Sequence, residues 1–195
     1  PGGLPAANAG RGEGSLKGKR VSKDKRYKIL DAAEKLFALS GYEGAGMRQI
    51  SLEAGVAQAL IHYHFGTKER LFEAVVARRS GEINRQREQR LDALFQHSEN
   101  PALEDITDAL LRPTIEVGHR LAHSTNDFAK ILVSIANSAD RRSTGLVAHY
   151  YNPIARKFIT AFEKTTPGLS RENAVWAYMF AIGVGMTMMA QTGRP

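Results

Sequence analysis

Residues 55–65, GVAQALIHYHF, decide how the first half of this chain folds. A short helix is expected from Met47 to Ala54, and a second from about Ala57 to His64. Between them Gly55 permits a tight turn, and Val56 is an apolar residue that can pack back between the two helices. Two short helices joined in this way predict a helix-turn-helix.

The flanking sequence has the apolar spacing of helices and lacks the alternation typical of strands. One predicted helix face before the motif consists of Ile29, Leu30, Ala33, Leu36 and Phe37, and Gly41 ends that helix. Thr67 is the predicted N-cap of the next helix. Asn100-Pro101 marks a boundary. Beyond it we expect helices near 102–120, 126–138, 145–164 and 170–192, with Pro113 and Pro153 at kinks or first turns. The fold class is therefore predicted to be all-α.

Charge is distributed unevenly along the chain. The net charge is +7, and residues 1–90 carry 17 Lys and Arg against 10 Asp and Glu, whereas residues 91–195 carry 10 of each. A basic half beside a neutral half favours a polyanion as the partner of the first half. Basic segments without a specific role are the alternative. Residues 1–21 lack the apolar core of a signal peptide and are expected to form a flexible basic tail.

The His-Tyr-His run raises the question of a metal site, which its spacing disfavours. His62 and His64 are two residues apart, about 200° around a helix, so they cannot share one metal ion. The chain has no cysteine, and no Asp or Glu follows closely in the sequence. No metal or cofactor is predicted. The absence of G-x-S-x-G, H-E-x-x-H, P-loop and paired-carboxylate motifs also argues against an enzyme.

The run ILDAAEKLFALSGYEGAGMRQISLEAGVAQALIHYHFGTKERLF, residues 29–72, resembles the TetR family of bacterial transcriptional repressors. The shared features are an apolar first helix ending in Gly-Tyr, the Ala-Gly-Val turn, a recognition helix ending in aromatic residues and Phe, and a Lys-Glu-x-Leu sequence after it. The resemblance implies an N-terminal three-helix DNA-binding domain followed by an α-helical ligand-binding and dimerisation domain.

The resemblance and the chemistry of the side chains together suggest the DNA contacts. A recognition helix lies in the major groove, where the amide of Gln58 suits adenine, Ala59 allows close approach and Leu60 suits a thymine methyl group. His62 and Tyr63 fall at positions that contact the DNA backbone, and Phe65 packs inward. His64 is expected to pack inward as well, with a contact to DNA as the alternative. Five further residues are expected near phosphates or a groove: Lys25, Arg26, Arg48, Thr67 and Lys68.

Several positions depart from the family pattern. Gly46 stands where Ser or Thr usually caps the second helix, Ala57 replaces a common Ser, and Ala59-Leu60 replaces a common Gly-Thr pair. The last change removes a hydroxyl that could bind DNA. Direct readout of bases is therefore expected to be sparse, leaving more to DNA shape and backbone contacts.

The second half contains an uncharged run, AVWAYMFAIGVGMTMMAQT, at residues 174–192. Its length reaches that of a membrane span, but a buried helix at a dimer interface or around a ligand pocket explains it better. A weak resemblance to acyl-sensing family members implies an apolar or acyl effector. The candidate effector residues are Arg112, His119, Tyr151, Trp176 and Met179, with core packing or a surface position as the alternative for each.

In TetR relatives the last two helices of each subunit usually form a four-helix dimer interface. The sequence ends soon after the helix near 170–192, so the family's last helix is missing from it. We expect truncation or disorder of that helix rather than a smaller interface.

These observations predict a flexible tail over residues 1–21, a helix-turn-helix DNA-binding domain over 22–70 and a helical effector-binding and dimerisation domain over 71–195. The expected function is that of a cytoplasmic, ligand-responsive repressor, a homodimer on a palindromic double-stranded DNA operator, released by a small molecule and not bound to a membrane. The alternatives are a DNA-binding protein without an effector and, least favoured, an enzyme.

Overall fold

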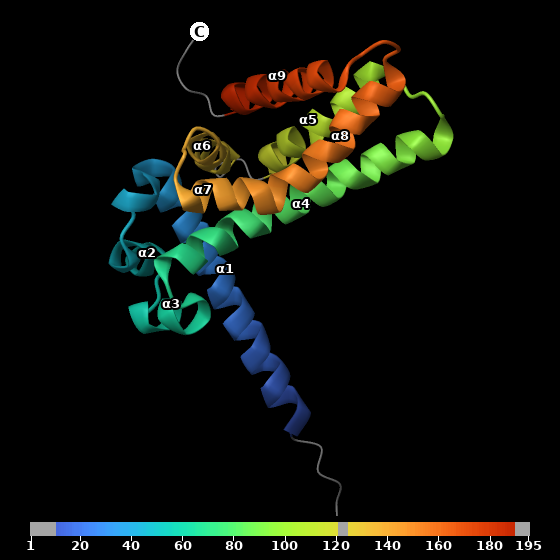
Figure 1. Ribbon diagram of the computed structural model, residues 1–195. Helices are drawn as coiled ribbons and strands as arrows, with labels where there is room; N and C mark the ends of the chain where they lie inside the picture. The colour runs from blue at the N-terminus through green and yellow to red at the C-terminus, as the bar shows by residue number, and fades with distance from the viewer. Residues whose placement is uncertain (1–10, 121–124, 190–195) are drawn as a thin grey trace, which may run out of the picture.

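The computed structural model describes the backbone of residues 11–120 and 125–189 and the side chains of residues 23–116 and 127–186. Helices occupy most of this part of the chain, and it contains no strand, which confirms the all-α prediction (Figure 1). The helices are α1 (Arg11–Gly44), α2 (Met47–Glu53), α3 (Gln58–Phe65), α4 (Lys68–His97), α5 (Leu103–Arg120), α6 (Thr125–Ala136), α7 (Arg141–Leu146), the π-helical turn η1 (Val147–Tyr151), α8 (Asn152–Thr165) and α9 (Arg171–Met189).

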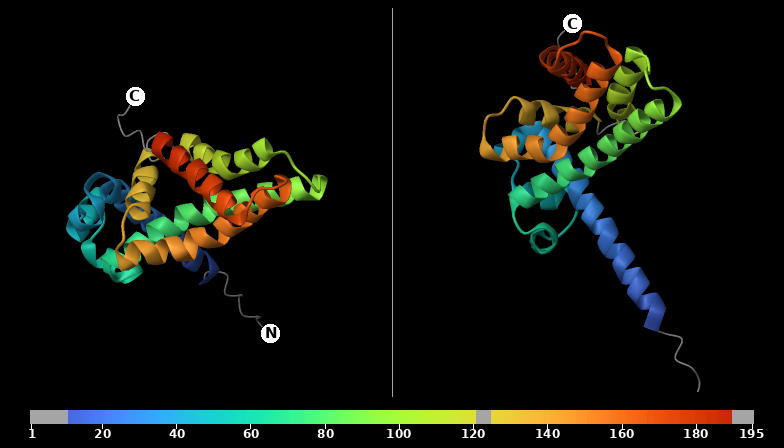
Figure 2. Two further views of the ribbon diagram at one scale, coloured as in Figure 1. Left: turned by 45° about the horizontal axis from the view of Figure 1, so that its top comes forward. Right: turned by 45° about the vertical axis from the view of Figure 1, so that its right-hand side comes forward.

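The first helix differs from the expectation at both of its ends. Helix α1 begins at Arg11, within the segment expected to be a flexible tail, and its first turns project away from the other helices (Figure 2). At the other end Gly41 adopts φ +68°, a left-handed conformation that glycine tolerates without a steric penalty. The chain kinks there and continues helically to Gly44.

A first hydrophobic core holds α1, α2, α3 and the start of α4 together. Its fully buried members include Ile29 of α1, Ile50 of α2, Ile61 of α3 and Leu71 of α4. The predicted apolar face of α1 is part of this core. Burial of these side chains fixes α3 against the rest of the domain, since each buried aliphatic side chain contributes roughly 1.5–3 kcal/mol.

The first core is not confined to residues 22–70. Ile131 and Ile135 of α6 and Leu146 of α7 are buried in it as well. A second core lies between α4, α5, α8 and α9, around the fully buried Phe158. Helix α4 contributes to both cores along its length (Figure 1). Helix α4 therefore joins the two cores directly.

The single helix expected over residues 145–164 is a wrong prediction. Helix α7 begins earlier, at Arg141, because the Asp140 carboxylate accepts hydrogen bonds from the backbone N–H groups of Arg142 and Ser143, at 3.0 and 3.1 Å. A π-helical turn then interrupts the helix before α8. Pro153 occupies the first turn of α8, one of its two expected roles.

The other expected helices shift by a few residues. Pro113 lies inside α5, and α6 ends at Ala136 rather than near residue 138. No helix in the described ranges is long and apolar enough to cross a membrane.

Candidate DNA-binding surface

The turn between α2 and α3 has the expected geometry. Gly55 adopts φ +63°, and the N–H of Val56 donates to the carbonyl of Ser51 at 3.0 Å. Val56 is half-buried and packs against the first core. The missing side-chain cap at Gly46 is partly replaced from inside the helix, since the Gly46 N–H donates to Oε1 of Gln49 at 3.1 Å. The turn and its packing hold α3 at a fixed angle to α2.

Helix α3 has a buried side and an exposed side. Ile61 and Phe65 are buried, which confirms that Phe65 packs inward, while His64 is half-buried. Leu60 is also half-buried and packs against the core. The exposed side carries Gln58, Ala59, His62 and Tyr63, and the Tyr63 side chain is 81% exposed. An aromatic ring this exposed contributes little to the core, so it is available to a partner.

Gln58 and His62 form a hydrogen-bonded chain along that exposed side. Nε2 of Gln58 lies 3.4 Å from Nε2 of His62, and Nδ1 of His62 lies 2.8 Å from the carbonyl oxygen of Gly66. The N–H of Gly66 donates in turn to the carbonyl oxygen of His62, at 2.9 Å. His62 is therefore fixed by the residue that ends its own helix.

Basic side chains flank the exposed side of α3. Arg48 of α2 and Lys25 and Arg26 of α1 are exposed. The guanidinium carbon of Arg26 lies 5.1 Å from the centroid of the Phe65 ring, which places it beside the end of α3. The geometry thus brings one cation of α1, Arg26, to the end of the recognition helix.

The start of α4 adds a further cation to this surface. Thr67 caps the helix, as predicted: its hydroxyl accepts the N–H of Arg70 at 3.2 Å. Lys68 is half-buried, and its Nζ donates to the carbonyl oxygen of Glu43 at 3.1 Å. The same ammonium lies 4.6 Å from the centroid of the Tyr42 ring. The Lys68 ammonium is consequently held in place before any ligand arrives.

Arg142, which the sequence analysis did not single out, also lies against the Tyr42 ring. Its guanidinium carbon lies 3.4 Å from the centroid of the Tyr42 ring, and Nη2 lies 3.8 Å from Oε1 of Glu43. Arg142 belongs to α7, so this contact joins the second half of the chain to the helix-turn-helix. The sequence signal that could have revealed it is the Ser-x-Asp run at 138–140, a helix start that places Arg142 in the first turn.

A buried carboxylate joins α1 to α4. Glu34 is 1% exposed, and its Oε2 receives hydrogen bonds from Nη2 of Arg78 at 2.6 Å and from Nε of Arg79 at 2.8 Å. Arg78 also donates to the exposed Asp31 at 2.7 Å. Since a buried charge without a partner is costly, this network fixes the angle between α1 and α4.

The four candidate effector residues whose side chains are described do not form one site. Arg112 lies on the exposed side of α5, paired with Asp108, whose pKa is lowered by the hydrogen bonds from Arg112. Trp176 and Met179 are more than half exposed on α9. Tyr151 is half-buried against the first core, its hydroxyl is 2.5 Å from that of Ser80, and desolvation of this hydroxyl raises its pKa. The side chain of His119 lies outside the described residues.

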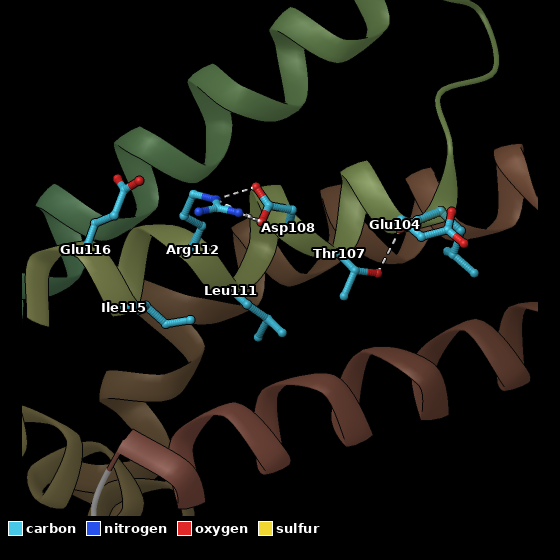
Figure 3. A pocket seen from close by; sticks show the side chains of 8 residues that line it. Glu104, Thr107, Asp108, Leu111, Arg112, Ile115 and Glu116 are labelled. Carbon is cyan, nitrogen blue, oxygen red and sulfur yellow. Dashed lines mark hydrogen bonds and ion pairs between the residues drawn. The ribbon is translucent and has the colours of Figure 1, made fainter.

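One of the five, Arg112, lines a groove on α5 of about 730 Å³ (Figure 3). Figure 3 shows Leu111 and Ile115 directed toward α9, while Arg112 and Asp108 pair on another side of α5. The lining residues are Leu103, Glu104, Thr107, Asp108, Leu111, Arg112, Ile115 and Glu116. An apolar surface with a few charged groups at its border can bind an amphipathic small molecule.

Arg87 is a buried cation in the second half that the sequence analysis missed. It is 5% exposed, and its Nε and Nη2 donate to the carbonyl oxygen of Leu110 and to the hydroxyl of Thr114, at 2.8 and 3.0 Å. Burial lowers its pKa. These bonds join α4 to α5 beside Pro113, where the helix lacks a backbone donor.

Two family descriptions match the chain. "Bacterial regulatory proteins, tetR family" matches residues 29–75, and "Tetracyclin repressor-like, C-terminal domain" matches residues 108–195. The chain therefore belongs to the TetR family of DNA-binding transcriptional regulators, as its resemblance predicted. The proteins of this family are transcriptional regulators, so the membership argues against the alternative of an enzyme.

Curated relatives match over the helix-turn-helix region. The transcriptional regulator LmrA of Bacillus subtilis is 52% identical over 49 residues, which are 25% of this chain and 26% of LmrA. The transcriptional activator FasR of Mycolicibacterium smegmatis is 38% identical over 66 residues, 33% of this chain and 30% of FasR. The matched segments span about a quarter to a third of the length of these relatives.

Solved structures share the fold over a larger part of the chain. PfmR from Thermus thermophilus, a TetR family regulator, has a TM-score of 0.62 at 18% identity, with 86% of each chain covered. AibR in complex with isovaleryl coenzyme A and operator DNA has a TM-score of 0.63 at 20% identity, with 88% of this chain and 90% of AibR covered. At these identities the similarity is one of fold.

Proposed function

We propose that this chain acts in the cytoplasm as a repressor that binds a palindromic DNA operator as a homodimer and is released by a small-molecule effector. The observation that carries the proposal is the exposed side of α3, where Gln58, Ala59, His62 and Tyr63 face outward beside exposed cations of α1 and α2. A helix exposed in this way has the dimensions to enter the major groove. Names among the curated relatives, such as the repressor AcnR of Corynebacterium efficiens, agree with a role in repression.

Each exposed residue receives a role in this proposal. Gln58 reads a base, Ala59 allows the helix to approach closely, and Leu60 offers the uncovered part of its side chain to a thymine methyl group. His62 and Tyr63 lie beside the sugar-phosphate backbone. Phosphates are bound by the cations and the capping hydroxyl around α3: Lys25, Arg26, Arg48, Thr67 and Lys68.

An apolar stripe on α9 supports a second copy of the chain as partner. Trp176, Met179, Phe180 and Val184 are each more than half exposed, and they fall on one side of the helix. Helix α9 contacts α5, α6 and α8, which lie below it in Figure 1. Four large apolar side chains in one exposed stripe favour a protein partner. Because a palindromic operator requires two recognition helices, the partner we assign is an identical subunit.

The effector is assigned to the groove on α5. Its apolar lining and the Arg112–Asp108 pair suit a molecule with an apolar body and a polar end. The solved AibR complex contains isovaleryl coenzyme A, and a solved complex of SmeT contains triclosan. Both complexes show a non-protein ligand bound by a protein of this fold. An acyl effector is the class we expect here.

A shared aromatic ring joins α7 to one of the proposed phosphate-binding cations. Arg142 of α7 and Lys68 of α4 both lie against the Tyr42 ring, at 3.4 and 4.6 Å from its centroid. A movement of α7 therefore changes the position of a phosphate-binding cation. In a dimer, such movements alter the distance between the two recognition helices, so that they no longer fit half-sites one helical turn apart.

The test is binding of the purified protein to duplex DNA from its own promoter region, measured by fluorescence anisotropy at several salt concentrations. The proposal predicts saturable binding that weakens steeply with salt. Arg48→Ala weakens binding to all sequences, whereas Gln96→Ala, an exposed change on the outer part of α4, leaves it unchanged. Binding that is absent, or that does not respond to salt, contradicts the proposal.

A further inference from the structure

The hydrogen bonds around His62 define which of its ring nitrogens carries the proton. Nδ1 of His62 lies 2.8 Å from the carbonyl oxygen of Gly66, and a carbonyl oxygen only accepts hydrogen bonds. Nδ1 is therefore the donor. In the neutral imidazole Nε2 is then an acceptor, and it lies 3.4 Å from Nε2 of Gln58. One N–H of the Gln58 amide consequently points at His62.

This contact orients the two unlike ends of the amide. The Gln58 amide has one oxygen acceptor and two N–H donors. With one N–H directed to His62, the oxygen and the second N–H remain free at the exposed start of α3. If the amide turned by 180°, its oxygen would face the Nε2 acceptor of His62 and the hydrogen bond would be lost. The His62 ring thus favours one of two orientations.

The free edge of the amide matches one base. In the major groove adenine offers the N6 donor beside the N7 acceptor, which the free oxygen and N–H of Gln58 complement, whereas guanine offers two acceptors. We propose that His62 is a specificity-determining residue, which orients the Gln58 amide so that it reads adenine and rejects guanine. This inference rests on the proposed function, but it assigns to His62 a role beyond contact with the DNA backbone.

The anchor of His62 lies within the DNA-binding domain. The carbonyl oxygen of Gly66 accepts a hydrogen bond from Nδ1 of His62, and the N–H of Gly66 donates to the carbonyl oxygen of His62 at 2.9 Å. Both bonds span one helical turn, as does the contact with Gln58. His97, at the end of α4, is also exposed, and its Nδ1 lies 2.7 Å from the carbonyl oxygen of Ala93, one helical turn earlier. It lies outside the proposed DNA-binding surface, so it provides a matched control.

The test begins with the operator that the full-length wild-type protein selects from a random duplex library. Each position of a half-site is then substituted, and binding is measured by fluorescence anisotropy at one salt concentration. For the wild type, we expect adenine to bind roughly tenfold or more tightly than guanine at one position per half-site. Gln58→Ala abolishes that preference, and His62→Phe, which keeps a ring but removes both nitrogens, loses most of it. His97→Phe, the same substitution away from the proposed DNA-binding surface, retains the preference.

A modified base separates orientation from a structural effect of the substitution. Replacing the read adenine with 7-deazaadenine removes the N7 acceptor, so it weakens wild-type binding several-fold and has little further effect on His62→Phe. If His62→Phe binds DNA with the wild-type preference, or remains as sensitive to 7-deazaadenine as the wild type, the inference is wrong. A wild-type protein that selects no duplex at all overturns the proposed function and the inference with it.

Discussion

The guanidinium carbon of Arg142 lies 3.4 Å from the centroid of the Tyr42 ring, so a residue of α7 is stacked on the residue that follows the kink of α1. The ring of Tyr42 also contacts Phe72 edge to face, with centroids 5.2 Å apart. The contact therefore joins α7, α1 and α4 at one point. Because Tyr42 and Phe72 both belong to the first core, this contact ties α7 to that core.

Arg142→Ala is expected to lower the free energy of unfolding by about 1–2 kcal/mol, because a partly buried cation–π contact is lost. Arg141→Ala, which alters the exposed neighbour, should change it by less than about 0.5 kcal/mol. A double-mutant cycle with Tyr42→Leu, followed by urea denaturation, measures the pair itself. A coupling free energy near zero would show that the stack does not contribute.

Glu34→Gln should destabilise the protein by about 3–5 kcal/mol, since it leaves the buried Arg79 and the largely buried Arg78 without their shared carboxylate. Asp31→Asn is the matched control. Asp31 pairs with Arg78 but its side chain is 65% exposed, so a change of about 0–1 kcal/mol is expected. Equal effects of the two substitutions in chemical denaturation would contradict the importance of the buried network.

The start of α7 should be sensitive to acid. Hydrogen bonds from the hydroxyl groups of Ser138 and Ser143 and from the Ser143 N–H hold the pKa of Asp140 below its ordinary value of 3.8. A carboxylate whose pKa is lower in the folded state stabilises the fold above its unfolded pKa, and this contribution is lost as the pH falls through the folded pKa. Asp140→Asn should therefore reduce the difference in stability between pH 7 and pH 3, measured by urea denaturation. Ser138→Ala should reduce it partly, and an unchanged difference in both variants would count against the cap.

Substitution of Phe180 by Glu tests the dimer. A charge in the apolar stripe of α9 should convert the dimer to a monomer in analytical ultracentrifugation and weaken binding to a full operator by more than tenfold, while leaving the helical circular dichroism unchanged. The control is Gln96→Glu, which adds the same charge at an exposed position of α4. If Phe180→Glu remains dimeric, the subunits associate through another surface.

The local features of the first domain could be predicted from sequence because they depend on residues close together in the chain. The Gly55 turn, the Thr67 cap and the buried face of α1 all follow from spacing and residue type. The inward position of Phe65 followed from the family pattern of the recognition helix. Membership of the TetR family was also correctly predicted from these residues.

The features that depend on distant residues could not be predicted. Glu34 and Arg79 are far apart in the sequence, and nothing in either segment indicates that they pair. The π-helical turn at Val147–Tyr151 was missed because the apolar spacing continues across it and no glycine or proline lies within it. The effector residues were chosen by residue type alone, and side chains of those types are placed by packing, so Arg112 lies at a groove while Tyr151 is half-buried against the first core.

The most direct test of the central claim is selection of duplexes from a random library by the purified protein, with affinity for the selected duplex measured against salt concentration. The account predicts a two-fold symmetric sequence whose log binding constant falls linearly with log salt, and a shallower slope for Lys68→Ala because one phosphate contact is lost. Failure to enrich any sequence, or enrichment of a sequence without symmetry whose binding is independent of salt, would contradict it.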